Sequence, residues 1–225
     1  MMRRGIGLDM NVKPHVKIKS FTSHQLFHFS IVIRMKDELT ALSDIILIRQ
    51  CLEGRREAFG ELINRYQKTV FNVAWRMVKD YQEAQDLTQT VFIKAYEKLD
   101  TFNTQHKFFS WIYRMAINES LNFVKRRRRF EAFDESAEYA AAKPIEEVEE
   151  SAMSRNVQSA LMHLGIDHRA LIVLKHFEDL SYEEIGYILD LPEKTVKSRL
   201  FTARQLLKNL MIKKGHVKHE QRQIH

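Results

Sequence analysis

Aromatic and basic side chains gather in one short stretch of the sequence, residues 101–129. Its rings are Phe102, Phe108, Phe109 and Trp111. A polar stripe at helical spacing follows and continues into Arg126 to Arg129: Arg114, Asn118, Asn122 and Lys125. Single-stranded nucleic acid is bound by rings that stack on bases, at roughly 1–3 kcal/mol for each base, and by cations that follow the backbone. The stretch therefore predicts a binding site for an unpaired strand.

The same aromatic residues could instead close a small hydrophobic core. We expect that role for about half of them, and Trp111 and Phe109 are the first candidates. The loop also offers Asn103, Thr104 and Gln105, whose side chains can read the edge of an unstacked base. It could then hold a flipped nucleotide.

A second group of basic residues lies on a helical hairpin near the C-terminus. Ser181 and Glu184 form a capping box that begins a short helix, which ends at Asp190 to Pro192. The next helix begins near residues 193–195 and buries the face that runs from Val196 to Leu207. Its opposite face holds the candidate DNA contacts: Lys194, Lys197, Ser198, Arg199, Phe201, Thr202 and Arg204.

This order of a short helix, a tight turn and a basic helix is typical of a helix-turn-helix motif, whose second helix enters the major groove. Phe201 points away from the core and can contact a thymine methyl group. Lys197, Arg199 and Arg204 would mostly contact phosphates, which gives affinity without sequence information. A solvated helical hairpin is the alternative interpretation.

A helix predicted from about Gln82 to Leu99 carries a third candidate surface. Leu87, Val91 and Ala95 recur at four-residue steps and should face the core. Polar and apolar side chains remain for its other faces: Asp86, Gln89, Thr90, Phe92 and Ile93. A surface isoleucine or phenylalanine beside polar groups indicates a protein partner.

The elements that must position these residues are helices. Seven glycines and three prolines in 225 residues leave few turns, which argues against a β-sandwich or barrel and predicts an all-α fold. We expect two small helical domains, at 35–129 and 153–212, joined by an acidic linker at 130–152. The net charge of +7 lies in the two ends: a basic extension at 1–34 and a basic tail at 213–225. The regular pattern begins at Met35, so residues 1–34 could be a disordered or non-native extension.

The composition excludes several classes of protein. Cys51 is the only cysteine, so neither an intramolecular disulfide nor a multi-cysteine zinc site can form. No apolar stretch of about 18 residues occurs, which argues against membrane insertion, and we expect a reducing cytoplasm. His24 with His28, and His216 with His219, have metal-compatible spacing but lie in the two ends without an enzyme motif. We therefore expect no metal, no cofactor and no catalytic activity.

Three stretches of this sequence, in this order, resemble the extracytoplasmic-function (ECF, group 4) sigma factors of the bacterial sigma-70 family. They are DLTQTVF at 86–92, FSWIYRMAIN at 109–118, and LSYEEIG at 180–186 followed by TVKSRL at 195–200. The resemblance covers about residues 40–212 and leaves out both ends. It implies a specificity subunit, not an enzyme, that binds core RNA polymerase and directs initiation at particular promoters.

The resemblance also implies a role for each stretch. The first corresponds to region 2.2, which docks on the clamp coiled coil of the polymerase, here through Asp86, Gln89, Thr90, Phe92 and Ile93. The second corresponds to regions 2.3 and 2.4, which melt the −10 element and read it as a single strand. That role falls on Phe102, Asn103, Phe108, Trp111, Arg114, Asn118, Asn122 and Lys125. The third corresponds to region 4, which reads the −35 element as a duplex through the seven residues given above.

Two further partners or roles follow from the resemblance alone. An anti-sigma factor would hold both regions in an inactive state, and the acidic linker would run through the polymerase near the RNA exit path. The sequence departs from the family at Thr90, where glutamate is usual, and at Thr202, where a basic residue is common. Glu193-Lys194 replaces a usual glycine, so the −35 preference should be idiosyncratic. Gly186 replaces a usual alanine, at a cost of up to about 1 kcal/mol of helix propensity.

A helix-turn-helix regulator that acts without core polymerase is the alternative function. It would account for residues 153–212 but would assign no function to the rings and arginines between Phe102 and Arg129. Binding to duplex promoter DNA in the absence of polymerase would favour it.

Overall fold

The computed structural model describes residues 39–131 and 152–213, and every regular element in these two ranges is helical. A first helix occupies residues 39–52. The others are α2 (Glu57–Val78), α3 (Tyr81–Glu97), the 3₁₀ turn η1 (Leu99–Thr101), α4 (Phe108–Glu131), α5 (Ala152–Met162), α6 (Ile166–Ile172), the π-helical turn η2 (Val173–Phe177), α7 (Tyr182–Leu189) and α8 (Glu193–Lys213). The predicted all-α fold is confirmed. The predictions for the N-terminal extension, for nearly all of the acidic linker and of the tail, and for both histidine pairs lie outside the described residues.

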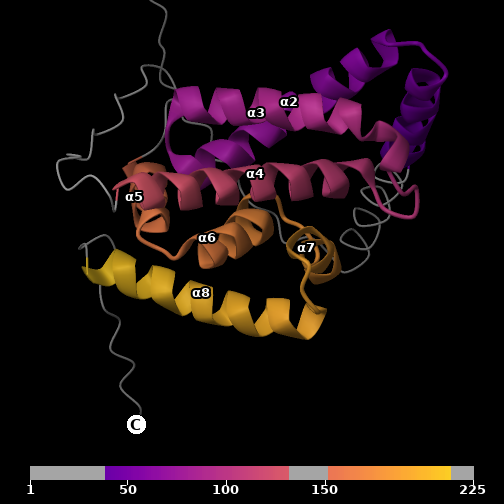
Figure 1. The fold of residues 1–225 in the computed structure, drawn as a ribbon. Helices are drawn as coiled ribbons and strands as arrows, with labels where there is room; N and C mark the ends of the chain where they lie inside the picture. The colour runs from indigo at the N-terminus through magenta and orange to yellow at the C-terminus, as the bar shows by residue number, and fades with distance from the viewer. Residues whose placement is uncertain (1–38, 132–151, 214–225) are drawn as a thin grey trace, which may run out of the picture. The chain divides into compact units, whose positions relative to one another are not determined.

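The helices α2, α3 and α4 pack side by side in the first half of the chain (Figure 1). Their apolar residues recur at three- and four-residue steps, so each helix turns one stripe inward. The fully enclosed side chains include Leu62, Val70 and Met77 of α2, Val91 and Ala95 of α3, and Ile112 and Ile117 of α4. This core holds α4 and the loop before it in place.

The junction between α2 and α3 is short because each helix end is capped locally. Lys79 adopts a left-handed conformation with φ of 52°, and its N–H donates to the carbonyl of Trp75 at 2.8 Å. Asp80 then begins α3, since its side chain accepts the N–H of Glu83 at 3.1 Å.

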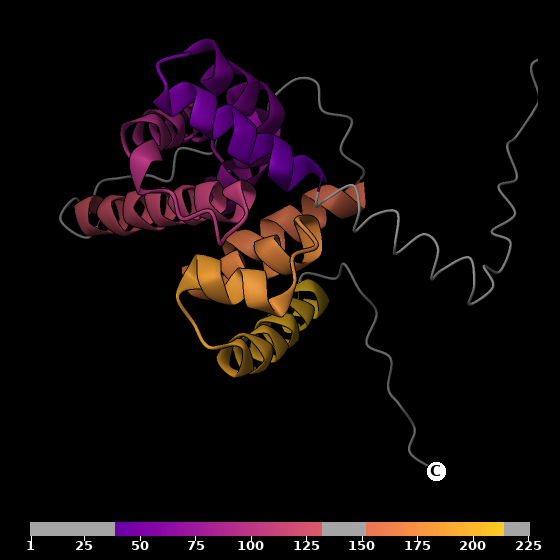
Figure 2. The same ribbon diagram turned by 90° about the vertical axis from the view of Figure 1, so that its right-hand side faces the viewer.

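The helices α5 to α8 form the second group, in which α8 lies on the far side of α6 and α7 from α4 (Figures 1 and 2). The predicted capping box is confirmed: the Ser181 hydroxyl accepts the N–H of Glu184 at 3.1 Å, and the N–H of Ser181 donates to the Glu184 carboxylate at 2.9 Å. Asp190 ends α7 in a left-handed conformation with φ of 56°. Val196, Leu200 and Ala203 of α8 are fully buried, which leaves the opposite face of this helix to solvent.

The structure explains why residue 186 is glycine, which the sequence alone did not. A Cβ atom at this position would lie 2.7 Å from the backbone carbonyl oxygen of Leu191. The turn between α7 and α8 folds back so closely that only glycine fits beneath it. The departure from alanine is therefore a requirement of this tight turn and not a simple loss of helix propensity.

Two buried polar side chains connect the two groups of helices within the unit Ala41–His225. Arg169 of α6 donates to the carbonyls of Leu161, Met162 and Leu164 at 2.8–3.4 Å and also to the carbonyl of Met77 in α2. Gln158 of α5 donates to the carbonyl of Arg76 at 3.3 Å. Carbonyls at a helix C-terminus lack partners within the helix, so the second group supplies them. One continuous hydrophobic core reaches from Ile48 to Ala203.

Candidate nucleic-acid interface

All seven candidate contacts on α8 are exposed, and they share the face opposite the buried stripe. Phe201 is 63 % exposed. Lys197 pairs with Glu193 one turn earlier at 2.6 Å, and this hydrogen bond raises the pKa of the lysine above its ordinary value. The Ser198 hydroxyl donates to the carbonyl of Thr195 at 3.1 Å, and that of Thr202 donates to the carbonyl of Ser198 at 3.3 Å. The face is preformed and carries cations, hydroxyls and one ring.

His176 is a neighbour of this face that the sequence analysis missed. The Arg204 Nε donates to the His176 Nε2 at 2.9 Å across 28 residues. Burial, and then the positive charges of Arg204 and Lys175, lower the pKa of His176 below its ordinary value. The neutral imidazole can therefore accept the hydrogen bond and orient the guanidinium. A lone histidine in a π-helical turn gave no signal in the sequence that would have predicted this contact.

The polar stripe of α4 divides into an open part and a covered part. Asn118, Asn122 and Lys125 are exposed. A groove of about 360 Å³ lies beside them, lined by Lys94, Glu119, Asn122, Lys125, Arg126 and Arg129, and Lys94 pairs with Glu119 there at 2.7 Å. Arg114 is half-buried instead, because its guanidinium donates to the backbone carbonyl of Tyr187 in α7 at 2.9 Å.

Two of the rings predicted to contact the unpaired strand belong to the core. Phe108 is 1 % exposed and Trp111 is 9 % exposed. They pack on each other and on Phe102 with ring centroids 5.4–5.7 Å apart, and Phe108 also packs on Tyr66 at 5.5 Å. We correct the prediction for Phe108 and Trp111: they support the loop from below, since neither can be reached by a base. The core role expected for Trp111 is confirmed, whereas Phe109 is only half-buried.

The loop itself keeps several groups at the surface. Phe102 is half-buried, while Asn103, Thr104 and Gln105 are exposed. The Asn103 side-chain oxygen accepts the N–H of Gln105 at 2.9 Å, which fixes the turn. The amide nitrogen of Asn103 and the exposed part of the Phe102 side chain remain as candidate contacts for a base.

The candidate protein-binding surface of α3 differs from its prediction at one residue. Asp86 and Gln89 are exposed, Ile93 is 59 % exposed and Thr90 is half-buried. Phe92 is 6 % exposed and packs edge-on against Phe59 at 6.5 Å. We correct the prediction for Phe92, which supports the surface from the core instead of lining it.

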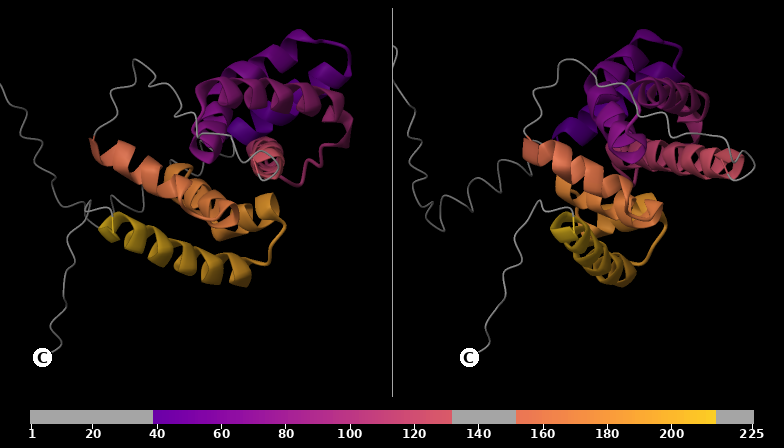
Figure 3. Two further views of the ribbon diagram at one scale, coloured as in Figure 1. Left: turned by 60° about the vertical axis from the view of Figure 1, so that its left-hand side comes forward. Right: turned by 90° about the vertical axis from the view of Figure 1, so that its left-hand side faces the viewer.

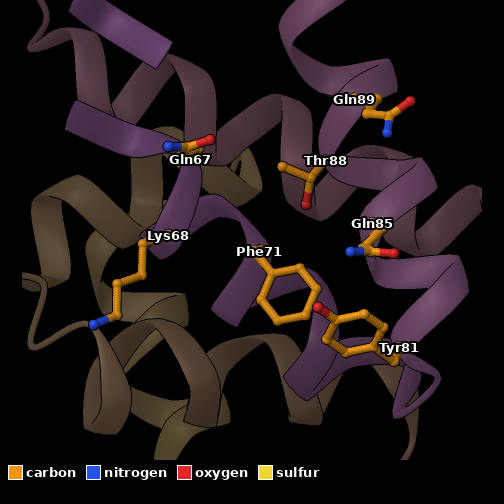
Figure 4. Close-up of a pocket in the computed structure, with 7 residues that line it drawn as sticks. All are labelled: Gln67, Lys68, Phe71, Tyr81, Gln85, Thr88 and Gln89. Atoms are coloured by element: carbon orange, nitrogen blue, oxygen red, sulfur yellow. The ribbon is translucent and has the colours of Figure 1, made fainter. Parts of the chain in front are cut away.

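A groove of about 370 Å³ extends this surface between α2 and α3 (Figure 4). Figure 4 shows Phe71 and Tyr81 at one end, with their ring centroids 5.2 Å apart, and Gln89 at the other. Gln67, Lys68, Gln85 and Thr88 complete its lining. The sequence analysis proposed no contact on the α2 side of this groove, because it assigned the protein-binding surface to the helix at 82–99 alone.

Comparison with known proteins bears on these surfaces. Residues 62–130 match the Sigma-70 region 2 family, and residues 154–207 match the Sigma-70, region 4 family. The RNA polymerase sigma-H factor of Pseudomonas aeruginosa is 39 % identical over 182 residues, which is 75 % of this chain and 94 % of that protein. The chain belongs to the ECF group of the sigma-70 family. The ECF RNA polymerase sigma-E factor of Escherichia coli is 35 % identical over 180 residues, which is 75 % of this chain and 94 % of the relative.

A solved structure shows the same fold. It is the sigma factor RpoE of Bartonella quintana in complex with the anti-sigma factor NepR, with a TM-score of 0.60 and 23 % identity, and it covers 68 % of this chain and 96 % of that one. The present chain is thus an RNA polymerase sigma factor that directs promoter-specific transcription initiation and is not an enzyme. The match to region 2 decides against the alternative of a helix-turn-helix regulator that acts alone.

In this sigma factor, the region 2 match contains α3 and almost all of α4, and the region 4 match contains the helix-turn-helix of α7 and α8 up to residue 207.

Cys51 is buried, which raises the pKa of its thiol. Within the described residues, no three His, Cys, Asp or Glu side chains are grouped to hold a metal ion. No helix in residues 39–131 or 152–213 is long and apolar enough to cross a membrane.

Proposed function

We propose that this sigma factor divides promoter recognition between two helices. α8 reads the −35 element as duplex DNA through Lys194, Lys197, Ser198, Arg199, Phe201, Thr202 and Arg204. α4 and the loop before it hold the −10 element as a single strand through Phe102, Asn103, Arg114, Asn118, Asn122 and Lys125. The observation that carries the proposal is that both faces are rich in amides, hydroxyls and cations, and that all the proposed α8 contacts are exposed.

The chemistry of each face fits a different form of DNA. α8 has the regular length of a recognition helix and ends its core stripe only at Met211, so its basic side can lie along a groove. The α4 face has amides beside cations and a ring at the edge of a loop, which suits bases that have left the stack.

Run-off transcription with purified core polymerase on the factor's own upstream DNA tests the proposal. Lys197→Ala should weaken binding to the duplex, because one phosphate contact is lost. Asn118→Ala should impair promoter opening and leave duplex binding unchanged, since it alters only the α4 face. Equal damage to the same step by both variants would contradict the division of labour.

The proposal also assigns the polymerase contact to α3, through Asp86, Gln89, Thr90 and Ile93, with the groove between α2 and α3 beside them. Such a protein meets its polymerase and its DNA in the cytoplasm. Ile93→Asp should reduce the affinity for core polymerase, because it places a charge in an exposed apolar contact. Glu97→Ala, at an exposed position of the same helix outside the proposed contact residues, is the control.

We further propose an anti-sigma factor as the negative regulator, supported by the fold shared with a sigma factor that was crystallised with one. A protein that co-purifies with the tagged sigma factor and abolishes run-off transcription in a purified system would support this. Undiminished transcription in its presence would contradict it.

A further inference from the structure

The π-helical turn η2 brings a histidine to the side of the proposed duplex-reading helix. α8 runs beside α5 and α6, and η2 continues directly from α6 (Figure 3). The N–H of Glu178 donates to the carbonyl of Val173 at 3.2 Å, five residues earlier, which is the hydrogen bond of a π-helix. Val173 and Leu174 are fully buried, whereas His176 is exposed. The apolar residues thus anchor the turn, and His176 reaches α8 at Arg204.

His176 holds the guanidinium of Arg204 through one nitrogen only. The Arg204 Nε donates to the His176 Nε2 at 2.9 Å. Arginine carries donors and no acceptor, so the ring nitrogen that faces it must be the unprotonated one. Within residues 39–131 and 152–213, Arg204 makes no other hydrogen bond or ion pair. Its two terminal nitrogens, Nη1 and Nη2, remain as a fork that matches two oxygens of one phosphate.

An apolar groove next to this pair offers the guanidinium no second acceptor. The groove has a volume of about 300 Å³ and lies between α5, α6 with η2, and α8. Besides His176 and two cations, its lining consists of Val157, Ile172, Phe177, Leu207 and Met211. These side chains carry neither oxygen nor nitrogen. The partners of Nη1 and Nη2 must therefore come from solvent or from a ligand on the exposed face of α8.

A neutral partner leaves the charge of Arg204 intact, unlike the partner of Lys197. Lys197 pairs with Glu193 at 2.6 Å, so a phosphate has to compete with a carboxylate for this cation. His176 fixes the direction of the guanidinium without cancelling its charge. A long side chain loses rotamer freedom when it binds a ligand. Arg204 has lost part of that freedom before DNA arrives, which makes it the preorganised cation of this face.

We infer that His176 is a positioning residue of the duplex-binding surface, which directs Nη1 and Nη2 of Arg204 to one phosphate of the −35 element. The inference rests on the proposed role of α8. Phosphate contacts fix the register and orientation of a protein on the duplex without reading its sequence. A directed Arg204 would set how far along the groove α8 lies. It would thereby set which base the ring of Phe201, one helical turn earlier, can meet.

The charges around the imidazole keep it in the form that accepts this hydrogen bond. Arg204, Lys175 and Asp179 act on His176, and Lys208 lines the same groove. Burial, and then the positive charges of Arg204 and Lys175, lower the pKa of His176, whereas Asp179 raises it. The groove residues of α5 and α6 do not titrate. Protonation at acidic pH would remove the acceptor and place a second cation against Arg204, so the orientation would be lost.

The test measures, by anisotropy, the affinity of the holoenzyme for a fluorescent duplex that carries the −35 region of the factor's own promoter. Arg204→Ala should weaken binding about tenfold, because one charge-assisted phosphate contact is lost. His176→Ala should weaken it about threefold, since Arg204 must then be ordered on binding. His176→Gln keeps an uncharged acceptor and should bind within about twofold of the wild type.

A double-substitution cycle separates positioning from a general structural role. In an Arg204→Ala background, His176→Ala should have no further effect on affinity, because no guanidinium remains to be oriented. In a Lys208→Ala background, which removes the other cation of the same groove, it should still cost about threefold. A defect in folding or in holoenzyme assembly would instead weaken every His176→Ala protein alike.

The pH dependence of duplex binding gives a second readout. Between about pH 7.5 and 5.5, the wild-type holoenzyme should lose affinity relative to the His176→Gln holoenzyme, because only the wild-type ring can be protonated. A ring that bound phosphate itself would gain affinity on protonation. That gain would overturn the positioning role.

The possible outcomes also separate this inference from the proposed function. If Arg204→Ala weakens duplex binding, but His176→Ala costs nothing or costs the same factor with and without Arg204, the positioning role is wrong and the duplex-reading role of α8 stands. If Arg204→Ala leaves duplex binding unchanged, the proposed contact of Arg204 fails and the inference fails with it.

Discussion

The faces of α8 and α4 that we propose to read DNA are both polar sides of long helices, yet their surroundings differ. On α8, every proposed contact is exposed, and the serine and threonine hydroxyls bond only to the backbone of their own helix. On α4, one arginine is bound by another helix, and two of the neighbouring rings are buried. Of the proposed contacts on the two helices, Arg114 is therefore the one that lies partly beneath another helix, whereas all seven on α8 are exposed.

The largest effect should come from the rings beneath the α4 loop. Phe108→Ala should lower the free energy of unfolding by about 3–5 kcal/mol, because it empties a fully enclosed site. Phe102→Ala should cost clearly less stability and reduce binding of the −10 strand by the holoenzyme. Chemical denaturation and strand-binding assays would measure both. Equal stability of the two variants would overturn the assignment of Phe108 to the core.

A substitution at Gly186 should disturb the orientation of α8 without a direct effect on α4. Gly186→Ala should destabilise the protein by about 1–3 kcal/mol, because the new methyl group would overlap the carbonyl of Leu191 and shift the turn that aims α8. Gly60→Ala is the matched control: no atom lies within 4 Å of its Cβ position in α2, so alanine should stabilise by about 0.5–1 kcal/mol. Denaturation curves that place both variants on the same side of the wild type would refute the requirement for glycine.

A substitution at Phe201 tests the proposed duplex-binding face of α8 without a change in fold. Phe201→Ala should reduce duplex affinity about tenfold, which corresponds to roughly 1.4 kcal/mol, because the ring would no longer contact the groove. Stability should stay the same within about 0.5 kcal/mol, since the ring is largely exposed. Leu206→Ala alters another exposed apolar side chain of α8 outside the proposed face and should leave duplex affinity intact. Equal losses in the two variants would argue against a specific role for Phe201.

The smallest effect concerns the histidine that orients Arg204. The pKa of His176 is lowered in the folded state, mainly by burial, so the unfolded chain binds its proton more readily. This residue's contribution to stability is therefore present above its unfolded pKa of about 6.5 and is lost as the pH falls below that value. His176→Gln keeps an acceptor for Arg204 but does not titrate, so its unfolding free energy should depend less on pH between 7.5 and 5.5. Parallel pH profiles would contradict the prediction.

The sequence by itself determined those features that depend on neighbouring residues. The capping box at Ser181, the helix-turn-helix and the exposed face of α8 were all predictable, because hydrogen bonds within one turn and spacings of three and four residues are local properties. Even the outward direction of Phe201 followed from counting along one helix.

The tertiary structure decided which rings belong to the core and which part of the α4 polar stripe is covered. Phe108 is buried while Phe109 is not, because Phe108 meets Tyr66, 42 residues away in the chain. The overlap that makes Gly186 necessary involves the backbone of a turn, and Arg114 is held by a carbonyl 73 residues further on. Such contacts depend on how whole helices pack, and no local spacing encodes them. Patterns along the chain therefore indicated the two helices that we propose to read DNA, and only their packing against other helices showed that Arg114 of α4 is half-buried while every proposed contact on α8 is exposed.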